Sequence, residues 1–238
     1  KRLITPLISE GKVEGWDDPR LPTLAALKRR GILPEAIKAF VLQFGLSKVE
    51  SEPGWGKLLH ENRKLLDERC VRRFFVKNPV KLSVTGAPQK EAVLKNHPTK
   101  PEMGQRSIAT SGAFLIPKSD FDAIVTGETF RLKDLYNVTI MERSGSGMVV
   151  KYEGDEGLAA KKLQWVVPED AVNCKVLLPK DLLDEDGNFR QDSMEEEAGV
   201  CEKSCLELEL GNAVQFERYG YAKLDKKEDN GLVFIFSC

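Results

Sequence analysis

The residues of this sequence that could do chemistry are not arranged for catalysis. Its two histidines, His60 and His97, support no Ser/His/Asp or Cys/His set, and no carboxylate pair is framed by an apolar pocket pattern. The five cysteines are odd in number, scattered and without a C-x-x-C pair, which predicts free thiols rather than a disulfide framework or a zinc site. We therefore expect no resident metal, and a cytoplasmic protein.

Two stretches imitate ligand-binding loops. Ser144–Gly147 is rich in glycine, but it lies between two strand patterns with no helix after it, so it predicts a hairpin turn. Asp184–Asn188 resembles the start of a calcium loop, yet the sixth loop position, which requires glycine, would be Phe189. Both stretches are expected to be turns.

A cationic turn is the more promising feature. Pro22 suits the first turn of a helix with Leu24 and Leu27 on its buried face, and Gly31 suits a left-handed C-cap. The last turn of this helix would carry Lys28, Arg29 and Arg30. These cations could simply be solvated and favoured by the helix dipole, or they could form a phosphate-binding face.

Charge is distributed unevenly along the chain. Its net charge is −1, but residues 1–78 hold 16 Lys and Arg against 10 Asp and Glu, residues 79–162 hold 12 against 10, and residues 163–238 hold 8 against 17. A basic first third and an acidic last third suggest that a polyanion docks on one side of the molecule.

Hydrophobic periodicity divides the 238 residues into three expected parts. The pattern of residues 1–78 predicts an all-α unit, in which residues 1–13 are an extended or looping segment and helices run from Pro34 to Gly45 and from about Trp55 to Arg73. About eleven short strand patterns follow, which is more than one small barrel needs. We expect an α+β multidomain chain with antiparallel β-barrels at 79–162 and 163–238. An open alternative is that the last strands pair with the first barrel. No apolar run is long enough for a membrane helix, so we expect a soluble protein.

Several motifs now indicate a family. The stretch Gly15–Gly31 resembles the region after the catalytic domain of class I glutamyl- and glutaminyl-tRNA synthetases of the archaeal and eukaryotic type. The likeness continues, in the family's order and over nearly the whole chain, at Pro79–Lys81, Asn96–Gly104 and Gln215–Tyr221. Lys1-Arg2 matches the tail of the family's KMSKS signature in its MSKR form, so the chain is expected to begin inside that loop, with the catalytic domain missing.

The resemblance implies roles for individual residues. In the whole enzyme Lys1 would steady the ATP phosphates, although in this piece it lacks the rest of its loop. The inner corner of the tRNA would be contacted by Arg20, Lys28, Arg29 and Arg30. The pocket for the central anticodon uridine would be formed by Arg72, Gln215 and Arg218, whose guanidinium and amide groups suit the O2, N3 and O4 positions of uracil.

Each pocket residue also has an ordinary structural interpretation. Arg72 could form a surface pair with Arg73, Gln215 could point outward from a strand, and Arg218 could pair with Glu217 or a carboxylate on a neighbouring strand.

Two features favour the glutamyl branch. Glutaminyl enzymes tend to carry a longer basic insertion where this sequence has only the link Ile124–Thr129, and Glu61–Asp67 looks more like the archaeal glutamyl branch. The resemblance thus implies the tRNA-binding half of an enzyme that joins glutamate to tRNA with ATP and Mg²⁺, neither of them bound by this piece. Its partner would be tRNA(Glu), with tRNA(Gln) as a second candidate and no membrane or DNA partner. The alternatives are the same region of a glutaminyl-tRNA synthetase and a stand-alone RNA-binding or assembly module.

Overall fold

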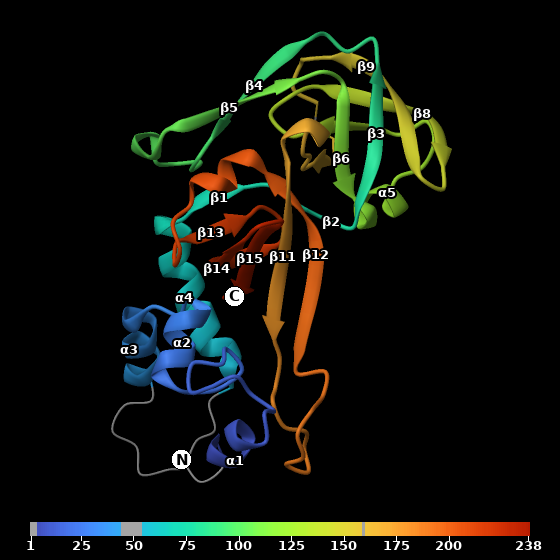
Figure 1. Cartoon of the computed structure of the whole chain (residues 1–238). Coiled ribbons are helices and arrows are strands. Elements are labelled where there is room, and N and C mark those ends of the chain that lie inside the picture. Colours follow the sequence, from blue (N-terminus) through green and yellow to red (C-terminus); the bar gives the residue numbers. More distant parts are fainter. Residues whose placement is uncertain (1–3, 44–53, 159) are drawn as a thin grey trace.

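The computed structural model describes residues 4–43, 54–158 and 160–238 of the chain. Figure 1 shows three parts arranged along one long axis: a group of helices, a seven-stranded sheet, and a six-stranded sheet that curls into a barrel. The expected α+β architecture, with a small helical unit and two barrel-like sheets, is confirmed.

Within the described residues, the first part contains four helices: α1 (Ile4–Ser9), α2 (Leu24–Arg30), α3 (Pro34–Leu42) and α4 (Trp55–Arg69). The expected extended or looping segment at residues 1–13 is wrong for residues 4–9, which are helical. Helix α3 begins at Pro34 as predicted, whereas its expected end at Gly45 lies outside the described residues. None of the helices in the described ranges is long and apolar enough to cross a membrane.

The ends of α2 are fixed by capping. It begins at Leu24, later than Pro22, because Thr23 is the N-cap and its Oγ1 accepts a hydrogen bond from the Ala26 N–H at 3.0 Å. Gly31 ends the helix with φ 89°, as predicted. Leu27 is buried as predicted, together with Ala26 and Arg30, but Leu24 is 74% exposed and its predicted place on the buried face is wrong.

The middle sheet joins strands from distant parts of the sequence. Two short strands, β1 (Val71–Arg73) and β2 (Phe75–Lys77), precede the first barrel along the chain, and the other five follow it. The order is β1, β13 (Ala213–Phe216), β14 (Gly220–Glu228), β15 (Gly231–Phe236), β11 (Ala171–Pro179), β12 (Met194–Glu202), β2.

This order changes the expected division of the chain. By strand pairing, residues 71–77 belong with residues 171–236, although the sequence placed them in the helical unit. The last strands do not return to the first barrel; β13 pairs with β1, and β15 pairs with β11. Helix α4 therefore leads directly into the middle sheet and stops at Arg69, short of the predicted Arg73.

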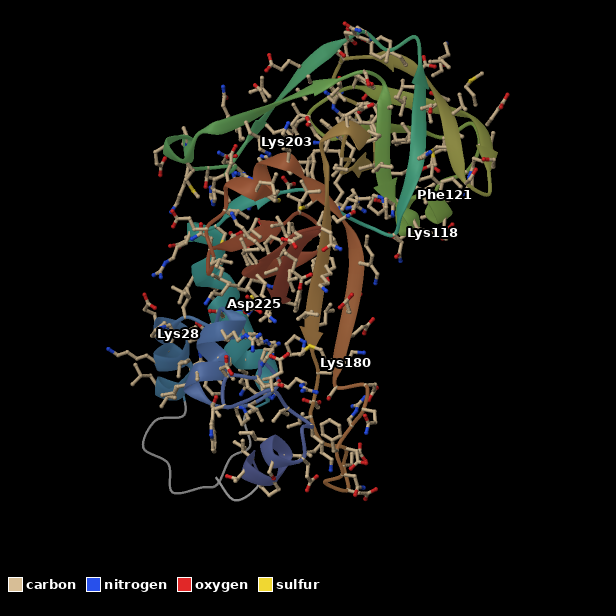
Figure 2. The ribbon with its side chains drawn as sticks, in the orientation of Figure 1. Lys28, Lys118, Phe121, Lys180, Lys203 and Asp225 are labelled. Carbon is tan, nitrogen blue, oxygen red and sulfur yellow. The ribbon has the colours of Figure 1, made fainter. Side chains whose placement is uncertain are left out.

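The last turn of α2 is fastened to the middle sheet. Arg29 donates from Nε and Nη2 to the two carboxylate oxygens of Asp225, each at 2.9 Å. Lys223 Nζ donates to the Lys28 carbonyl and Ser237 Oγ to the Arg30 carbonyl, both at 2.6 Å. Figure 2 labels Lys28 on the helical unit and Asp225 on the sheet beside it. The bonds from Lys223 and Ser237 reach carbonyl groups of the last turn of the helix, and the Lys28 carbonyl also accepts the Gly31 N–H at 3.2 Å.

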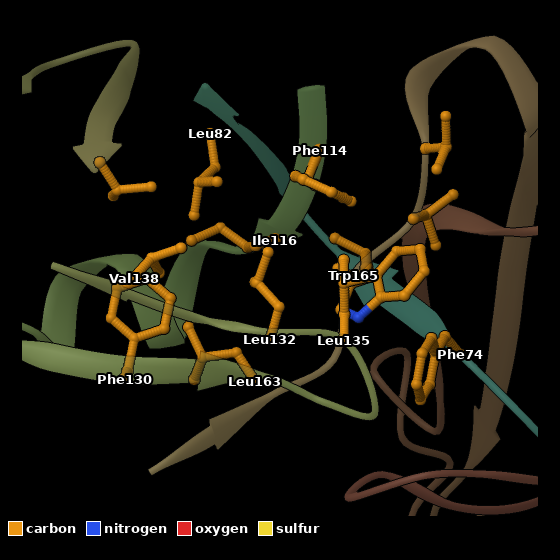
Figure 3. Packing of buried hydrophobic residues seen from close by; sticks show 14 of the residues in the cluster. Phe74, Leu82, Phe114, Ile116, Phe130, Leu132, Leu135, Val138, Leu163 and Trp165 are labelled. Carbon is orange, nitrogen blue, oxygen red and sulfur yellow. The ribbon is translucent and has the colours of Figure 1, made fainter. Parts of the chain in front are cut away.

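The six-stranded sheet lies between β2 and β11 in the sequence. Residues after the expected boundary at 162 complete it, because Leu115 and Val166 exchange backbone hydrogen bonds at 2.8 and 3.0 Å. Its core combines aliphatic side chains with several aromatic rings. Trp165 is fully buried there, with its ring centroid 5.2 Å from that of Phe114 (Figure 3). The strand order is β10 (Lys162–Leu163), β7 (Thr129–Leu132), β8 (Asn137–Ser144), β9 (Gly147–Gly154), β3 (Pro79–Thr85), β6 (Ala113–Pro117).

Two additions decorate this barrel. The hairpin of β4 (Lys90–Lys95) and β5 (Gln105–Thr110) projects from it, and the short helix α5 (Lys118–Ala123) follows β6. Pairing in the described sheets is mostly antiparallel, as expected, with parallel pairs at β1–β13, β3–β9, β7–β10 and β11–β15.

We predict that Gly31→Ala destabilises the chain by about 1–3 kcal/mol, because φ is positive there and a methyl group would meet Ser237 Oγ at 2.5 Å. Gly11→Ala is the matched control: its φ is 69°, but no atom lies within 4 Å of the added methyl, so about 1 kcal/mol is expected. Urea unfolding of both variants measures the difference. Equal losses would show that the close approach of α2 to the sheet has no cost.

Candidate nucleic-acid interface

A cleft of ≈ 530 Å³ lies between α4 and the turn that joins β13 to β14. Gln215 and Arg218, both predicted from the sequence, line it from the sheet side. Helix α4 lines the other side with four polar residues spaced i, i+3, i+4 and i+7, which places them on one helical face: His60, Arg63, Lys64 and Asp67.

Arg72 stands next to Gln215 because β1 and β13 pair in parallel, with these two residues in register. Its Nη2 donates to Asp67 Oδ1 at 3.2 Å, and Asp67 also accepts the Tyr221 hydroxyl at 2.6 Å. The Nε of Arg72 is buried and has no partner among the described residues. The pairing of β1 with β13 thus brings a third predicted residue to the edge of the cleft.

Asp67 keeps its charge in this setting. The hydrogen bond from Tyr221, aided by the charge of Arg72, holds the pKa of Asp67 below its ordinary value. An ionised carboxylate only accepts hydrogen bonds, so Asp67 accepts from both Arg72 and Tyr221 beside the cleft.

Arg218 occupies an unusual backbone position. Its φ is 61°, in the left-handed region, and Gly220 follows with a φ of 149° where a Cβ would meet Phe236 Cε2 at 2.6 Å. The guanidinium is bound end-on by Asp120 of α5, with Nη1 to Oδ2 at 2.6 Å and Nη2 to Oδ1 at 2.9 Å. The partner expected for Arg218, Glu217 or a strand carboxylate, is instead a helix carboxylate of the other barrel.

The predicted tRNA-corner residues are mostly engaged within the chain. Arg20 makes a two-point pair with Asp18 and donates to Ser193 Oγ and the Lys12 carbonyl. Arg29 is held by Asp225 and by Glu14 at 3.0 Å. Arg30 is buried, 5.7 Å from the Trp55 ring, and donates to the Phe236 carbonyl. Lys28 is exposed, and its ammonium has no partner among the described residues.

Lys1, the predicted contact to ATP phosphates, lies outside the described residues. In the described ranges, no group of three His, Cys, Asp or Glu side chains is placed to hold a metal ion. All five cysteines are buried and unpaired.

Sequence reasoning missed Asp67 and Asp120, which hold Arg72 and Arg218, and Tyr221, whose hydroxyl donates to Asp67. The spacing of His60, Arg63, Lys64 and Asp67 was a visible signal for one polar face of α4. Asp120 gave no such signal, because it lies 98 residues from Arg218.

Two family models match this chain, and both describe the anticodon-binding domain of class I tRNA synthetases (E and Q). One matches residues 70–155 and the other residues 162–225. The chain belongs to this family. The first match covers β1 and most of the six-stranded barrel, and the second covers most of the middle sheet, including Gln215 and Arg218.

The curated relatives considered next are all named glutamate–tRNA ligase. The glutamate–tRNA ligases of Pyrococcus abyssi and Nitrosopumilus maritimus are each 40% identical to this chain, over 97% and 95% of its length. That of Methanocaldococcus jannaschii is 34% identical over 97% of the chain. The chain spans about two fifths of the length of these relatives, 39% or 40% in each case. Their names favour the glutamyl prediction over the glutaminyl one.

The contribution of the turn at Arg20 to stability can be tested by neutralising Asp18, the carboxylate that binds Arg20. Burial works to raise the pKa of Asp18, but hydrogen bonds from Arg20 and from two backbone N–H groups outweigh it and hold this pKa below its ordinary value. We predict that Asp18→Asn lowers the free energy of unfolding at pH 7 by about 2 kcal/mol. Because the pKa of Asp18 is lower in the folded chain than in the unfolded chain, ionised Asp18 stabilises the fold above about pH 4. This stabilisation is lost as the pH falls through the pKa of the folded state, so the difference in unfolding free energy between wild type and Asp18→Asn should shrink in acid.

Denaturant unfolding between pH 7 and pH 3 measures this difference. Asp17→Asn makes the same charge change at a carboxylate that is 57% exposed and 3.5 Å from Arg29, so a small effect is expected there. A loss for Asp18→Asn that is independent of pH would contradict the role given to its charge.

Proposed function

We propose that this chain reads the anticodon loop of tRNA(Glu) through the cleft between α4 and the β13–β14 turn, as part of a glutamate–tRNA ligase. The observation that carries the proposal is the register of β1 against β13, which sets Arg72 beside Gln215 with Arg218 three residues further along the same chain segment. Membership of the anticodon-binding family supports the same choice.

The chemistry of the cleft suits an unstacked uracil. The amide of Gln215 can accept the uracil N3–H with its oxygen and donate to a carbonyl with its nitrogen. Arg218 uses two of its five N–H donors on Asp120, which leaves Nε–H and one N–H on each terminal nitrogen for uracil oxygens. Cytosine lacks the N3–H and replaces O4 by an amino group, so the same donors and acceptors would disfavour it.

We predict that Arg218→Ala and Gln215→Ala each weaken binding of an anticodon stem-loop with a central U by about 1–3 kcal/mol. Fluorescence anisotropy of labelled stem-loops with a central U or C measures both affinities, and Arg72→Ala tests the third member. Arg190→Ala, at a surface arginine paired with Asp192 outside the cleft, is the matched control and should change neither affinity. If the variants weakened binding of the U and C stem-loops equally, the proposal that the cleft recognises the central base would be wrong.

The second contact is with the inner corner of the tRNA, and it rests on Lys28. Arg20, Arg29 and Arg30 of the predicted set are engaged within the chain, so Lys28 is the member with an ammonium group to offer a phosphate. Arg20, Arg29 and Arg30 would then act by holding the turn and helix that present it.

We predict that Lys28→Ala reduces the slope of log affinity against log salt for whole tRNA by about 1, because one phosphate contact is lost. Binding of the isolated anticodon stem-loop should not change. Lys38→Ala removes an exposed lysine from α3 and serves as the control for a general loss of charge. If Lys28→Ala and Lys38→Ala have the same effect on whole tRNA, the contact at Lys28 is refuted.

For the whole protein we propose ligation of glutamate to tRNA(Glu) in the cytoplasm. The five free, buried thiols support this location, because the cytosol keeps cysteines reduced. ATP and Mg²⁺ would be needed for that reaction, with Lys1 near the ATP phosphates, and we assign no step of it to the described residues. tRNA(Gln) is the second RNA proposed, because the third anticodon base rather than the central uridine separates the two tRNAs. ATP–pyrophosphate exchange by the intact protein with glutamate and with glutamine decides the amino acid; exchange with glutamine would overturn the proposal.

A further inference from the structure

The pair between Asp120 and Arg218 joins the two barrels at the cleft. Asp120 lies in α5 of the six-stranded barrel, and Arg218 lies in the β13–β14 turn of the middle sheet. The carboxylate is only 6% exposed, and both of its oxygens are within 2.9 Å of the guanidinium. Figure 2 labels Lys118 and Phe121 on either side of Asp120 in sequence, on the short helix at the base of that barrel.

Asp120 stays charged in this position. Burial works to raise its pKa, but the hydrogen bonds and charge of Arg218, with the neighbouring charge of Lys161, hold the pKa below its ordinary value. Lys161 Nζ lies 3.2 Å from Oδ1, so the carboxylate is shared between a lysine of its own barrel and an arginine of the other. A buried carboxylate with two cationic partners is a rigid anchor.

This anchor fixes the direction of the remaining donors of Arg218. A guanidinium is planar, with five N–H groups in a fixed fork. When the two terminal nitrogens are held end-on, the orientation of the plane is set and the edge that carries Nε is left over. In the described residues Nε of Arg218 has no partner, and the side chain is 44% exposed where it lines the cleft. The backbone supports the same geometry through the left-handed φ of 61° at Arg218.

We propose that Asp120 is a positioning residue for anticodon recognition: it holds Arg218 end-on so that the free edge of the guanidinium faces the central base. This inference rests on the proposed function of the cleft and names the residue that prepares it. Its physical basis is preorganisation, because a side chain that is already fixed loses less freedom when the RNA binds. The inference goes beyond Arg218 itself, since Asp120 need not touch the RNA.

The sign of the effect separates this role from simple electrostatics. Asp120→Asn removes a negative charge near a polyanion site, which by itself strengthens RNA binding. Loss of a positioning residue weakens binding and lowers the preference for U. Asp122→Asn is the matched control, because it makes the same charge change on the same helix at an exposed carboxylate paired with Lys118 at 2.8 Å.

The experiment measures the affinity of the 238-residue chain for stem-loops with a central U and a central C. Asp120→Asn should weaken binding to the U form by about tenfold relative to Asp122→Asn, while the C form changes equally in the two variants. In an Arg218→Ala background Asp120→Asn should have only the charge effect that Asp122→Asn has, because its positioning role acts through Arg218. A purely structural role would lower affinity in both backgrounds.

A stability control accompanies the binding data. Thermal unfolding reports whether each variant is folded, and Asp120→Asn combined with Lys161→Gln keeps the net charge and leaves no lysine facing a neutral amide. This double variant should show the same loss of preference for U.

The outcomes separate the two proposals. If Arg218→Ala leaves the preference for U unchanged, the proposed function of the cleft fails. If Arg218→Ala abolishes that preference while Asp120→Asn matches Asp122→Asn or binds more tightly, only the role of Asp120 is overturned.

Discussion

The entry of β1 and β2 into the middle sheet is the constraint on which the rest of the structure depends. Because α4 ends at Arg69 and β1 begins at Val71, the polar face of the helix is held against the β13–β14 turn, and the cleft forms between them. The same pairing makes the six-stranded barrel an insertion between β2 and β11. Hairpin β4–β5 returns to this junction, where the Arg72 N–H donates to the Asn96 carbonyl at 2.7 Å. One short stretch of chain therefore sets both the placement of the candidate site residues and the connection between the two barrels.

That stretch shows why the fold could be predicted only in part. Two barrels followed from the number and spacing of the strand patterns, and the start of α3 and the end of α2 followed from Pro34 and Gly31, because these signals are local. Strands β1 and β2 have three residues each, and their partners lie more than a hundred positions away. Helical spacing continued through Arg73 in the sequence, so only the sheet itself decides that the helix stops earlier.

The candidate site divides in the same way. Family motifs identified Arg72, Gln215 and Arg218, and β-sheet register places the first two side by side. Their carboxylate partners could not be read from the sequence, since Asp120 reaches Arg218 across the junction of two barrels. The cationic turn of α2 illustrates the opposite case. Its arginines had the expected helix-end position, but acceptors near the end of the chain, Asp225 and the Phe236 carbonyl, engage both of them.

Those acceptors also change the meaning of the charge asymmetry. A basic first third and an acidic last third suggested that a polyanion docks on one side, but many of the charges are used to hold the parts of the molecule together. Arg29 of the helical unit pairs with Asp225, and Lys133 of the six-stranded barrel pairs with Glu217 of the middle sheet. Glu202 is almost fully buried and forms ion pairs with both Arg73 and Arg106. Net charge by segment therefore overstates the cationic surface available to RNA. Under the proposed function, RNA recognition would rest on individual donors that intramolecular carboxylates leave open, such as the ammonium of Lys28 and the Nε edge of Arg218.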